Sequence, residues 1–276
     1  MKSRGFVLRL FVKVLRMTPL EEYYNKFNED KRLNSRHGRV EFQISMKYIH
    51  KYLEGKKNPK ILDVGAGTGR YSLTLAKEGY DVTAVELVQH NVGVLRQNAK
   101  RQGIELKAYK GNALKLKRFE DESFDLVLVF GPMYHLGTDE ERILALCEAK
   151  RVVKPDGVIM AAYVMNEYAV LTYAFKEKKI LECLAKGQLS PDFHTIADPE
   201  ELYHYVRLED MKRFYEGAGL QRICVVGVDG AADYIRPYLN ELTEEEFQVF
   251  VEYQMKICER MDLMGASAHT VDILKK

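Results

Sequence analysis

Short apolar runs alternate with amphipathic segments along most of the chain. The apolar runs predict buried strands, and segments with apolar residues every three to four positions predict helices. Strands and helices that alternate at this spacing predict a doubly wound α/β domain around a mostly parallel sheet. The expected strands are Ile61–Val64, Val82–Glu86, Leu106–Lys110, Leu126–Phe130, Val158–Tyr163, Ile223–Val228 and His269–Leu274. The expected helices are Leu20–Asn28, Ile44–Leu53, Tyr71–Glu78, Val88–Gln102, Glu140–Val153 and Leu208–Gly217.

The turn after the first expected strand is rich in glycine. The segment KILDVGAGTGRY places Gly65, Gly67 and Gly69 between the strand and the helix. Because glycine has no Cβ, the backbone N–H groups of such a turn can face a ligand closely. Asp63 stands at the carboxyl end of the strand, where open parallel sheets bind their ligands. Arg70 follows Gly69, so the spacing is G-x-G-x-G and differs from the G-x-G-x-x-G dinucleotide fingerprint.

DVGAGTG resembles the nucleotide-binding loop of class I S-adenosylmethionine-dependent methyltransferases. The resemblance continues in order through DVTAVE, KGNA, FDLVLVFGPMYHL and VVKPDGVIMAAY, and it covers Pro59 to Tyr163. It implies S-adenosylmethionine as the cofactor, with Glu86 on the ribose. Asn112 stands where the family usually has an acid, and its amide oxygen can also accept a hydrogen bond from adenine. The cofactor-binding residues that it implies are Asp63, Gly65, Ala66, Gly67, Gly69, Glu86, Leu87, Asn112, Ala113 and Phe130.

The family resemblance also implies the topology. We expect a Rossmann-like sheet of seven strands, six parallel and the last antiparallel beside the sixth. Residues 1–58 are expected to form a helical segment that covers the site, and residues 59–276 the methyltransferase domain. Inserts at 164–207 and 229–267 would emerge at the ligand edge and form a lid over a pocket; the alternative is that they form a dimer contact. The second insert contains a capping box at Thr243–Glu246.

Methyl transfer from a sulfonium mainly requires alignment of the reactants, and a base only where the acceptor is protonated. His135, with its neighbour Tyr134, is the first candidate base, because it follows the fourth strand; the alternative is that it only packs in its loop. His194 and His269 rank below it. The candidate substrate-binding residues are Tyr24, Arg36, His37, Tyr163 and His269. The segment around Arg36 is either a solvated loop or a cover over the cofactor. No His, Cys and carboxylate set has metal-ligand spacing, so we expect no metal.

Composition narrows the class of partner. Forty-two basic and forty acidic residues give a net charge of +2, which does not favour general binding to nucleic acid or acidic membranes. The four cysteines lie far apart, which disfavours a zinc site and fits a reducing cytoplasm. The apolar run Phe6–Leu15 is too short to span a bilayer, so we expect no stable membrane insertion. It is expected to be an amphipathic helix or an upstream extension, and the alternative is a peripheral membrane anchor.

Three functions remain from the sequence. The first is a methyltransferase that acts on a small molecule at O, N or S, as a monomer or homodimer. The second is a tRNA-modifying methyltransferase, for which a basic strip could contact phosphates. The third is a non-catalytic cofactor-binding protein of the same fold. The basic strip consists of Lys47, Lys51, Lys56, Lys57 and Lys60.

Overall fold

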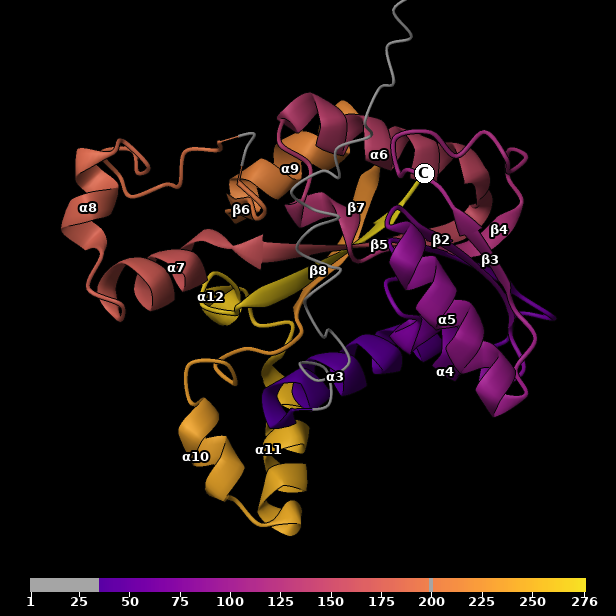
Figure 1. The fold of residues 1–276 in the computed structure, drawn as a ribbon, viewed down its shortest axis with the longest axis horizontal. Coiled ribbons are helices and arrows are strands. Elements are labelled where there is room, and N and C mark those ends of the chain that lie inside the picture. Colours follow the sequence, from indigo (N-terminus) through magenta and orange to yellow (C-terminus); the bar gives the residue numbers. More distant parts are fainter. Residues whose placement is uncertain (1–34, 199–200) are drawn as a thin grey trace, which may run out of the picture.

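An eight-stranded sheet forms the centre of the computed structural model, which describes residues 35–198 and 201–276 (Figure 1). The strand order is β3-β2-β1-β4-β5-β8-β7, and the two-residue β6 pairs with β5. β8 is antiparallel to both β5 and β7, whereas the other pairs are parallel. The strands are β1 (Lys60–Val64), β2 (Asp81–Glu86), β3 (Lys107–Lys110), β4 (Phe124–Val129), β5 (Val153–Met165), β6 (Tyr205–Val206), β7 (Gln221–Gly227) and β8 (His269–Lys275). The predicted fold class and antiparallel strand are confirmed, and β6 is an addition.

Helices cover both faces of this sheet (Figure 1). One face carries α3 (Arg36–Leu53) and α4 (Arg70–Lys77), and the other carries α6 (Asp139–Val152) and α9 (Leu208–Gly217). α5 (Gln89–Gln102) packs beside β2 and β3. The remaining elements are η1 (Pro132–Tyr134), α7 (Asn166–Ala169), η2 (Val170–Phe175), α8 (Ile180–Ala185), α10 (Arg236–Glu241), α11 (Glu244–Ile257) and α12 (Met261–Met264).

The alternation of side chains along β5 divides the core into two layers. Ile159, Ala161 and Tyr163 join the cluster under α6 and α9, whereas Met160 and Ala162 join the cluster under α3. Because successive side chains of a strand point to opposite faces, residues one position apart belong to different layers. This periodicity decides which residues of β5 can reach a site on either face.

Helix α3 begins eight residues before the expected start at Ile44, at Arg36. Ser35 is its N-cap, and the Ser35 hydroxyl accepts a hydrogen bond from the Gly38 N–H at 3.4 Å. The segment from Arg36 onward is therefore helical and is not a loop, and Arg36 itself does not line the cavity described below. Its helical geometry directs the Arg36 and Arg39 guanidiniums onto the Phe247 ring of α11, at 5.1 and 4.7 Å from the centroid.

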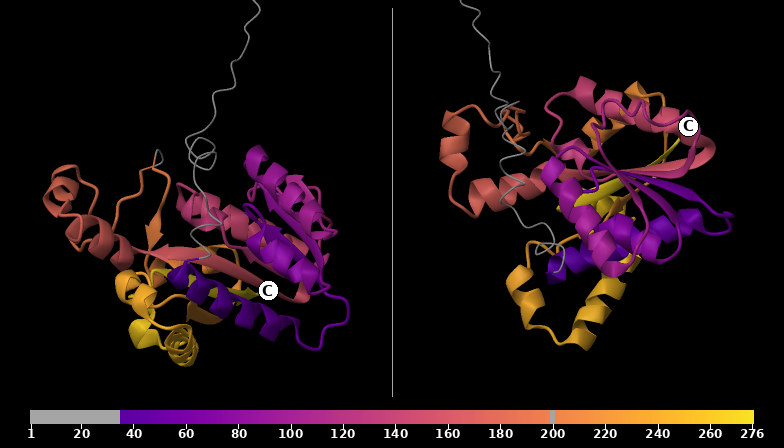
Figure 2. Two further views of the ribbon diagram at one scale, coloured as in Figure 1. Left: turned by 60° about the horizontal axis from the view of Figure 1, so that its bottom comes forward. Right: turned by 45° about the vertical axis from the view of Figure 1, so that its right-hand side comes forward.

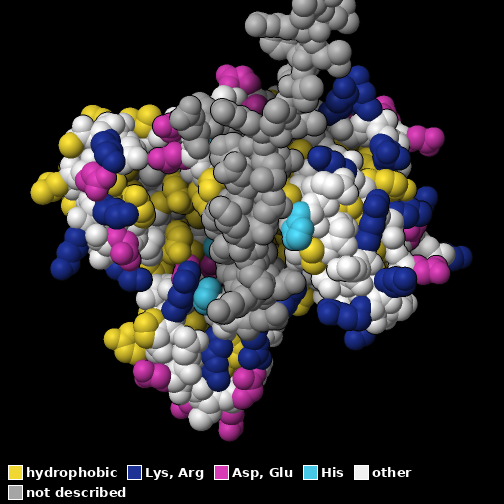
Figure 3. All heavy atoms as spheres, viewed as in Figure 1, with side chains coloured by type: hydrophobic (Ala, Val, Ile, Leu, Met, Phe, Trp, Pro, Cys, Tyr) yellow, Lys and Arg dark blue, Asp and Glu magenta, His cyan; other side chains and the backbone are white. Residues whose placement is uncertain are grey.

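The two inserts lie on different sides of the domain. α7, η2 and α8 continue outward from the end of β5 as a separate wing (Figures 1 and 2). α10 and α11 instead pack against α3. Hydrophobic side chains are exposed over the α7–α8 wing (Figure 3), among them Leu171, Tyr173, Phe175, Leu181 and Leu184. Within the described ranges, no helix has the length and apolar character needed to cross a membrane.

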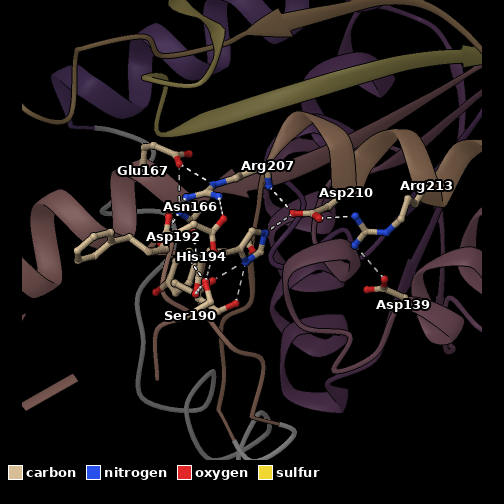
Figure 4. A network of polar contacts seen from close by, with 12 residues as sticks. Asp139, Asn166, Glu167, Ser190, Asp192, His194, Arg207, Asp210 and Arg213 are labelled. Carbon is tan, nitrogen blue, oxygen red and sulfur yellow. Dashed lines mark hydrogen bonds and ion pairs between the residues drawn. The ribbon is translucent and has the colours of Figure 1, made fainter. Parts of the chain in front are cut away.

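A charged histidine links the first insert to α9 (Figure 4). The Nδ1 atom of His194 lies 2.9 Å from the Thr195 carbonyl oxygen, and its Nε2 lies 2.6 Å from Asp210 Oδ2. Both partners only accept hydrogen bonds, so both ring nitrogens donate and the ring is an imidazolium. Burial alone would lower the pKa of His194, but Thr195 and Asp210 together hold it above its ordinary value. Asp210 is further paired with Arg213 at 2.7 Å.

We expect His194→Gln to destabilise the protein by about 1.5–3 kcal/mol at pH 6, the scale for losing hydrogen bonds to a charged group. Because the pKa of His194 is higher in the folded than in the unfolded protein, its protonation stabilises the fold. This stabilisation is fully present below the unfolded pKa and is lost as pH rises through the folded pKa. The difference from the wild type should therefore shrink at pH 9. Urea unfolding at both pH values measures it. The matched control is His50→Gln, because His50 also pairs with a carboxylate at 2.7 Å but is 45% exposed; a similar loss there would contradict the account.

Candidate active site

A cavity of about 260 Å³ lies at the carboxyl ends of β1, β2 and β4. The glycine-rich turn after β1 forms one wall, and the loop after β4 forms another. Glu41 and Ser45 of α3, Ala162 of β5 and His269 of β8 complete it. The cavity therefore stands at the edge of the sheet where the sequence predicted the ligand.

The three glycines of the turn have two different roles. A Cβ on Gly65 would stand 2.5 Å from Pro132 Cδ, and one on Gly69 would stand 2.8 Å from Leu95 Cγ, so both are needed for packing. A Cβ on Gly67 would meet no protein atom within 4 Å, although its φ of +55° strains any larger residue. Gly67 lines the cavity. The space beside its backbone fits a ligand that approaches the turn closely.

Glu86 holds the turn in place from the end of β2. Its carboxylate accepts hydrogen bonds from the Gly67 N–H at 2.9 Å and the Val88 N–H at 2.8 Å, and it is 7% exposed. Burial raises the pKa of Glu86, while the Val88 and Gly67 N–H groups oppose that rise. The carboxylate thus lines the cavity at the position predicted for ribose binding.

Asp63, at the end of β1, is fully buried beneath the turn. Its carboxylate accepts a hydrogen bond from the Ser72 hydroxyl of α4 at 2.5 Å. Burial raises the pKa of Asp63 to about 6, the Ser72 hydroxyl opposes the rise, and Glu86 adds to it. Asp63 therefore connects the strand end to the first turn of α4, and its side chain lies beside the same cavity.

The other predicted cofactor-binding residues, among them the adenine candidate Asn112, also line the cavity. Leu87 is 38% exposed, which is unusual for a leucine at a strand end and provides an apolar surface for a ring. The Asn112 amide oxygen accepts a hydrogen bond from the Leu114 N–H at 2.9 Å, and a carbonyl oxygen has a second lone pair. Ala113 and Phe130 complete this part. Together, the open space at Gly67, the Glu86 carboxylate and the apolar Leu87 fit S-adenosylmethionine.

His135 and Tyr134 lie in the cavity wall, on and just after η1. The Nδ1 atom of His135 is 2.6 Å from the Leu202 carbonyl oxygen, so it carries the proton and Nε2 has the lone pair. Burial lowers the pKa of His135 to about 4; the Leu202 carbonyl opposes this and His204 adds to it. A base with so low a pKa is a weak proton acceptor at neutral pH.

His269 lines the cavity at the start of β8, beside a buried carboxylate from the end of β7. Its Nδ1 lies 2.6 Å from Asp229 Oδ2. Asp229 was not predicted from the sequence, since it precedes His269 by 40 residues and no local motif connects the two.

Among the described residues, Glu41, Asp229 and His269 are one group with ligand atoms close enough for a metal, within 4.8 Å of one another.

Three predicted substrate-binding residues do not line the cavity, and a fourth, Tyr24, lies outside the described residues together with the expected helix Leu20–Asn28. Arg36 donates to the Leu239 carbonyl oxygen at 3.1 Å, and the His37 ring contacts the Ser35 hydroxyl, so both lie at the start of α3. Tyr163 is buried against Phe214, because strand alternation points it away from the face that carries Ala162. The structure thus corrects the expected placement of Arg36, His37 and Tyr163.

The structure adds cavity residues that the sequence reasoning missed. Tyr71 packs edge-on against Phe130 at 5.0 Å, and Arg70 lies over the Phe42 ring at 4.3 Å. None of the described residues within 164–207 or 230–267 lines this cavity. The inserts contact its wall from outside: the Leu202 carbonyl and the Tyr203 ring lie against His135, and Asp229 against His269, so the lid stays a prediction. The added residues are Glu41, Ser45, Arg70, Tyr71, Asn91 and Glu141.

Comparison with known proteins agrees with this site. The model of a methyltransferase domain matches residues 62–161. The ubiquinone biosynthesis O-methyltransferase of Pasteurella multocida is 29% identical over 59% of this chain and 69% of its own length. The enzyme of that name from Methylocella silvestris is also 29% identical, over 67% of this chain and 69% of its own length.

Solved structures show the same fold. An S-adenosylmethionine-dependent methyltransferase from Methanosarcina mazei is 18% identical, with a TM-score of 0.56 over 83% of this chain and 96% of its own. The CcbJ methyltransferase from Streptomyces caelestis is 14% identical, with a TM-score of 0.58 over 93% and 95%. With the sheet order, the glycine-rich turn and Glu86 already described, the chain has a methyltransferase domain at residues 62–161 and the fold of S-adenosylmethionine-dependent methyltransferases, and it is a methyltransferase.

Proposed function

We propose that this methyltransferase binds S-adenosylmethionine in the cavity and transfers its methyl group to an oxygen of a small molecule. The observation that carries the proposal is that one cavity is lined both by residues expected to bind the donor and by histidines that can accept a proton. The donor-binding candidates Gly67 and Glu86 line it together with His135 and His269. A cavity of about 260 Å³ favours a small acceptor over a polymer.

Oxygen is the acceptor atom that the comparisons favour. The two relatives named above are matched over 69% of their own length, and both are called ubiquinone biosynthesis O-methyltransferases. S-adenosylmethionine supplies an activated methyl group when bound. The chain's own residues bind and orient the two reactants and accept the acceptor proton, because an O–H group must lose a proton for methylation. We further propose a cytoplasmic location, since all four cysteines are free thiols.

The basic strip gives little support to the tRNA alternative. Lys47 donates to the Met255 carbonyl oxygen at 3.3 Å, Lys51 lies 4.0 Å from Glu259, and Lys56 pairs with Asp156 at 3.0 Å. Three of these five lysines thus have protein acceptors close by. The histidines in the cavity wall, His135 and His269, disfavour a non-catalytic protein.

Methyl transfer from labelled S-adenosylmethionine tests the proposal. We expect label in catechol, a small acceptor with ionisable O–H groups, and none in bulk unmodified tRNA. Extraction into organic solvent separates the two products. Label recovered in tRNA alone would favour the second function, and binding of the donor without transfer to any acceptor would favour the third.

A further inference from the structure

His269 and Asp229 form an acid–base pair at the cavity in which both carboxylate oxygens accept hydrogen bonds. Asp229 is buried, with 4% of its side chain exposed. Its Oδ1 accepts hydrogen bonds from the Ser267 hydroxyl at 2.9 Å and from the His269 N–H at 2.8 Å. Its Oδ2 accepts from His269 Nδ1 at 2.6 Å. Both oxygens are thus held by groups from one short segment, which fixes the carboxylate relative to the ring.

This geometry determines the tautomer of the imidazole. The Asp229 carboxylate only accepts hydrogen bonds, so Nδ1 of His269 carries the proton. In a neutral ring Nε2 then has the lone pair. A carboxylate that orients a histidine and stabilises its protonated form is the arrangement used where histidine removes a proton from a hydroxyl. His269 lines the cavity, and Ala162 lies in the same wall.

We infer that His269 is the general base of the methyl transfer and that Asp229 is its positioning residue. The inference rests on the proposed function. Nε2 of His269 removes the proton of the acceptor O–H, whose bonding pair stays on oxygen. An oxygen lone pair then forms the bond to the methyl carbon, while the pair of the methyl–sulfur bond stays on sulfur and leaves it a neutral thioether. The proton passes from Nε2 to water after the product departs.

His135 is the competing base at the same cavity. Its Nδ1 donates to a neutral carbonyl, that of Leu202, so no carboxylate stabilises its protonated form. His269 instead has the Asp229 carboxylate on Nδ1 and Glu41, from α3, on the same side of the cavity. Among the described residues, Tyr168 of α7 also packs near His269, with the ring centroids 6.4 Å apart. The surroundings therefore favour His269 as the group that gains a positive charge.

Asp229→Asn tests the positioning role with little change of shape. The asparagine oxygen can keep the bonds from Ser267 and from the His269 N–H, while its amide NH₂ replaces Oδ2 and donates to Nδ1. The tautomer must then invert, with the proton on Nε2. Long-range ¹H–¹⁵N NMR of the histidine rings reads the tautomer without turnover. We expect Nδ1–H in the wild type and Nε2–H in the variant; Nε2–H in the wild type would overturn the inference.

His269→Gln tests the catalytic role with two acceptors. Catechol must lose a proton, whereas 4-nitrothiophenol is already a thiolate at pH 7.5 and requires no base. We expect kcat for catechol to fall about 10²- to 10³-fold in His269→Gln and in Asp229→Asn, the scale of general base catalysis. The thiolate reaction should change less than about threefold, as should both reactions in the control His194→Gln, which lies outside this cavity.

Equal losses of kcat with both acceptors would show that His269 has a structural role. That result would overturn the inference that His269 is the base and leave the proposed function unaffected. S-adenosylmethionine affinity, measured by calorimetry, should stay within about twofold in both variants, which separates loss of the base from loss of the fold. A wild type that binds the donor and has the expected tautomer but methylates neither acceptor would overturn the proposed function, and the base with it.

Discussion

Gly67→Val is expected to abolish S-adenosylmethionine binding, with a loss of affinity of at least about 100-fold, or 2.7 kcal/mol. A side chain at Gly67 would enter the open space of the cavity, where no protein atom lies within 4 Å of its Cβ. It would also block the close approach of a ligand to the backbone of the turn. Isothermal titration with S-adenosylmethionine measures the effect, and Gly67→Ala should give an intermediate loss.

The control for Gly67→Val must separate a blocked cavity from backbone strain. Gly103 ends α5 with φ +67°, and a Cβ there would also meet no atom within 4 Å, but Gly103 is not part of the cavity. Gly103→Val therefore introduces a similar strain, of about 1–3 kcal/mol, without touching the site. We expect it to lower the midpoint of thermal unfolding and leave affinity unchanged. Equal affinities in wild type and Gly67→Val would place the donor elsewhere.

Arg222→Met is expected to destabilise the protein by about 3–5 kcal/mol, because it leaves a buried carboxylate without its partner. Asp272 of β8 is fully buried, and both of its oxygens accept from the Arg222 guanidinium at 2.7 Å. Burial raises the pKa of Asp272, and Arg222 opposes that rise. Urea unfolding monitored by circular dichroism measures the loss.

The loss in Arg222→Met should depend on pH in a defined direction. Without the guanidinium, Asp272 has a folded pKa far above its unfolded value, so the folded state binds more protons above pH 4. Stability then falls as pH rises, and the variant should lose less at pH 5 than at pH 8. The double variant Arg222→Met with Asp272→Leu removes both charges and should recover most of the stability. A double variant as unstable as the single one would contradict this explanation.

The strands and the donor turn could be predicted from the sequence because their signals are local. The apolar run at Ile61 and the glycines after it specify a buried strand and an open turn without reference to the rest of the chain. Glu86 follows from its place at the end of the next strand. The boundaries agree with the structure within a few residues, except for the early start of α3 at Arg36 and of β5 at Val153.

The acceptor end of the site could not be predicted in the same way. Asp229 and His269 are brought together by the pairing of β7 with β8, and neither residue carries a motif. Glu41 reaches the cavity because α3 crosses that face of the sheet. The placement of Tyr163, in contrast, was open to sequence reasoning, since the alternation along β5 assigns it to the face opposite Ala162.

Calorimetric titration of wild type and Glu86→Ala with S-adenosylmethionine tests the central claim most directly. Glu86 lines the cavity and accepts a hydrogen bond from the Gly67 N–H at 2.9 Å, so its loss removes a charged partner of the turn and the proposed partner of the donor. We predict micromolar binding to the wild type and a loss of about 1–3 kcal/mol in the variant. Glu78→Ala, which removes an exposed carboxylate at the C-terminal end of α4, is the control and should bind like the wild type. Absence of binding to the wild type, or equal binding to Glu86→Ala, would contradict the account.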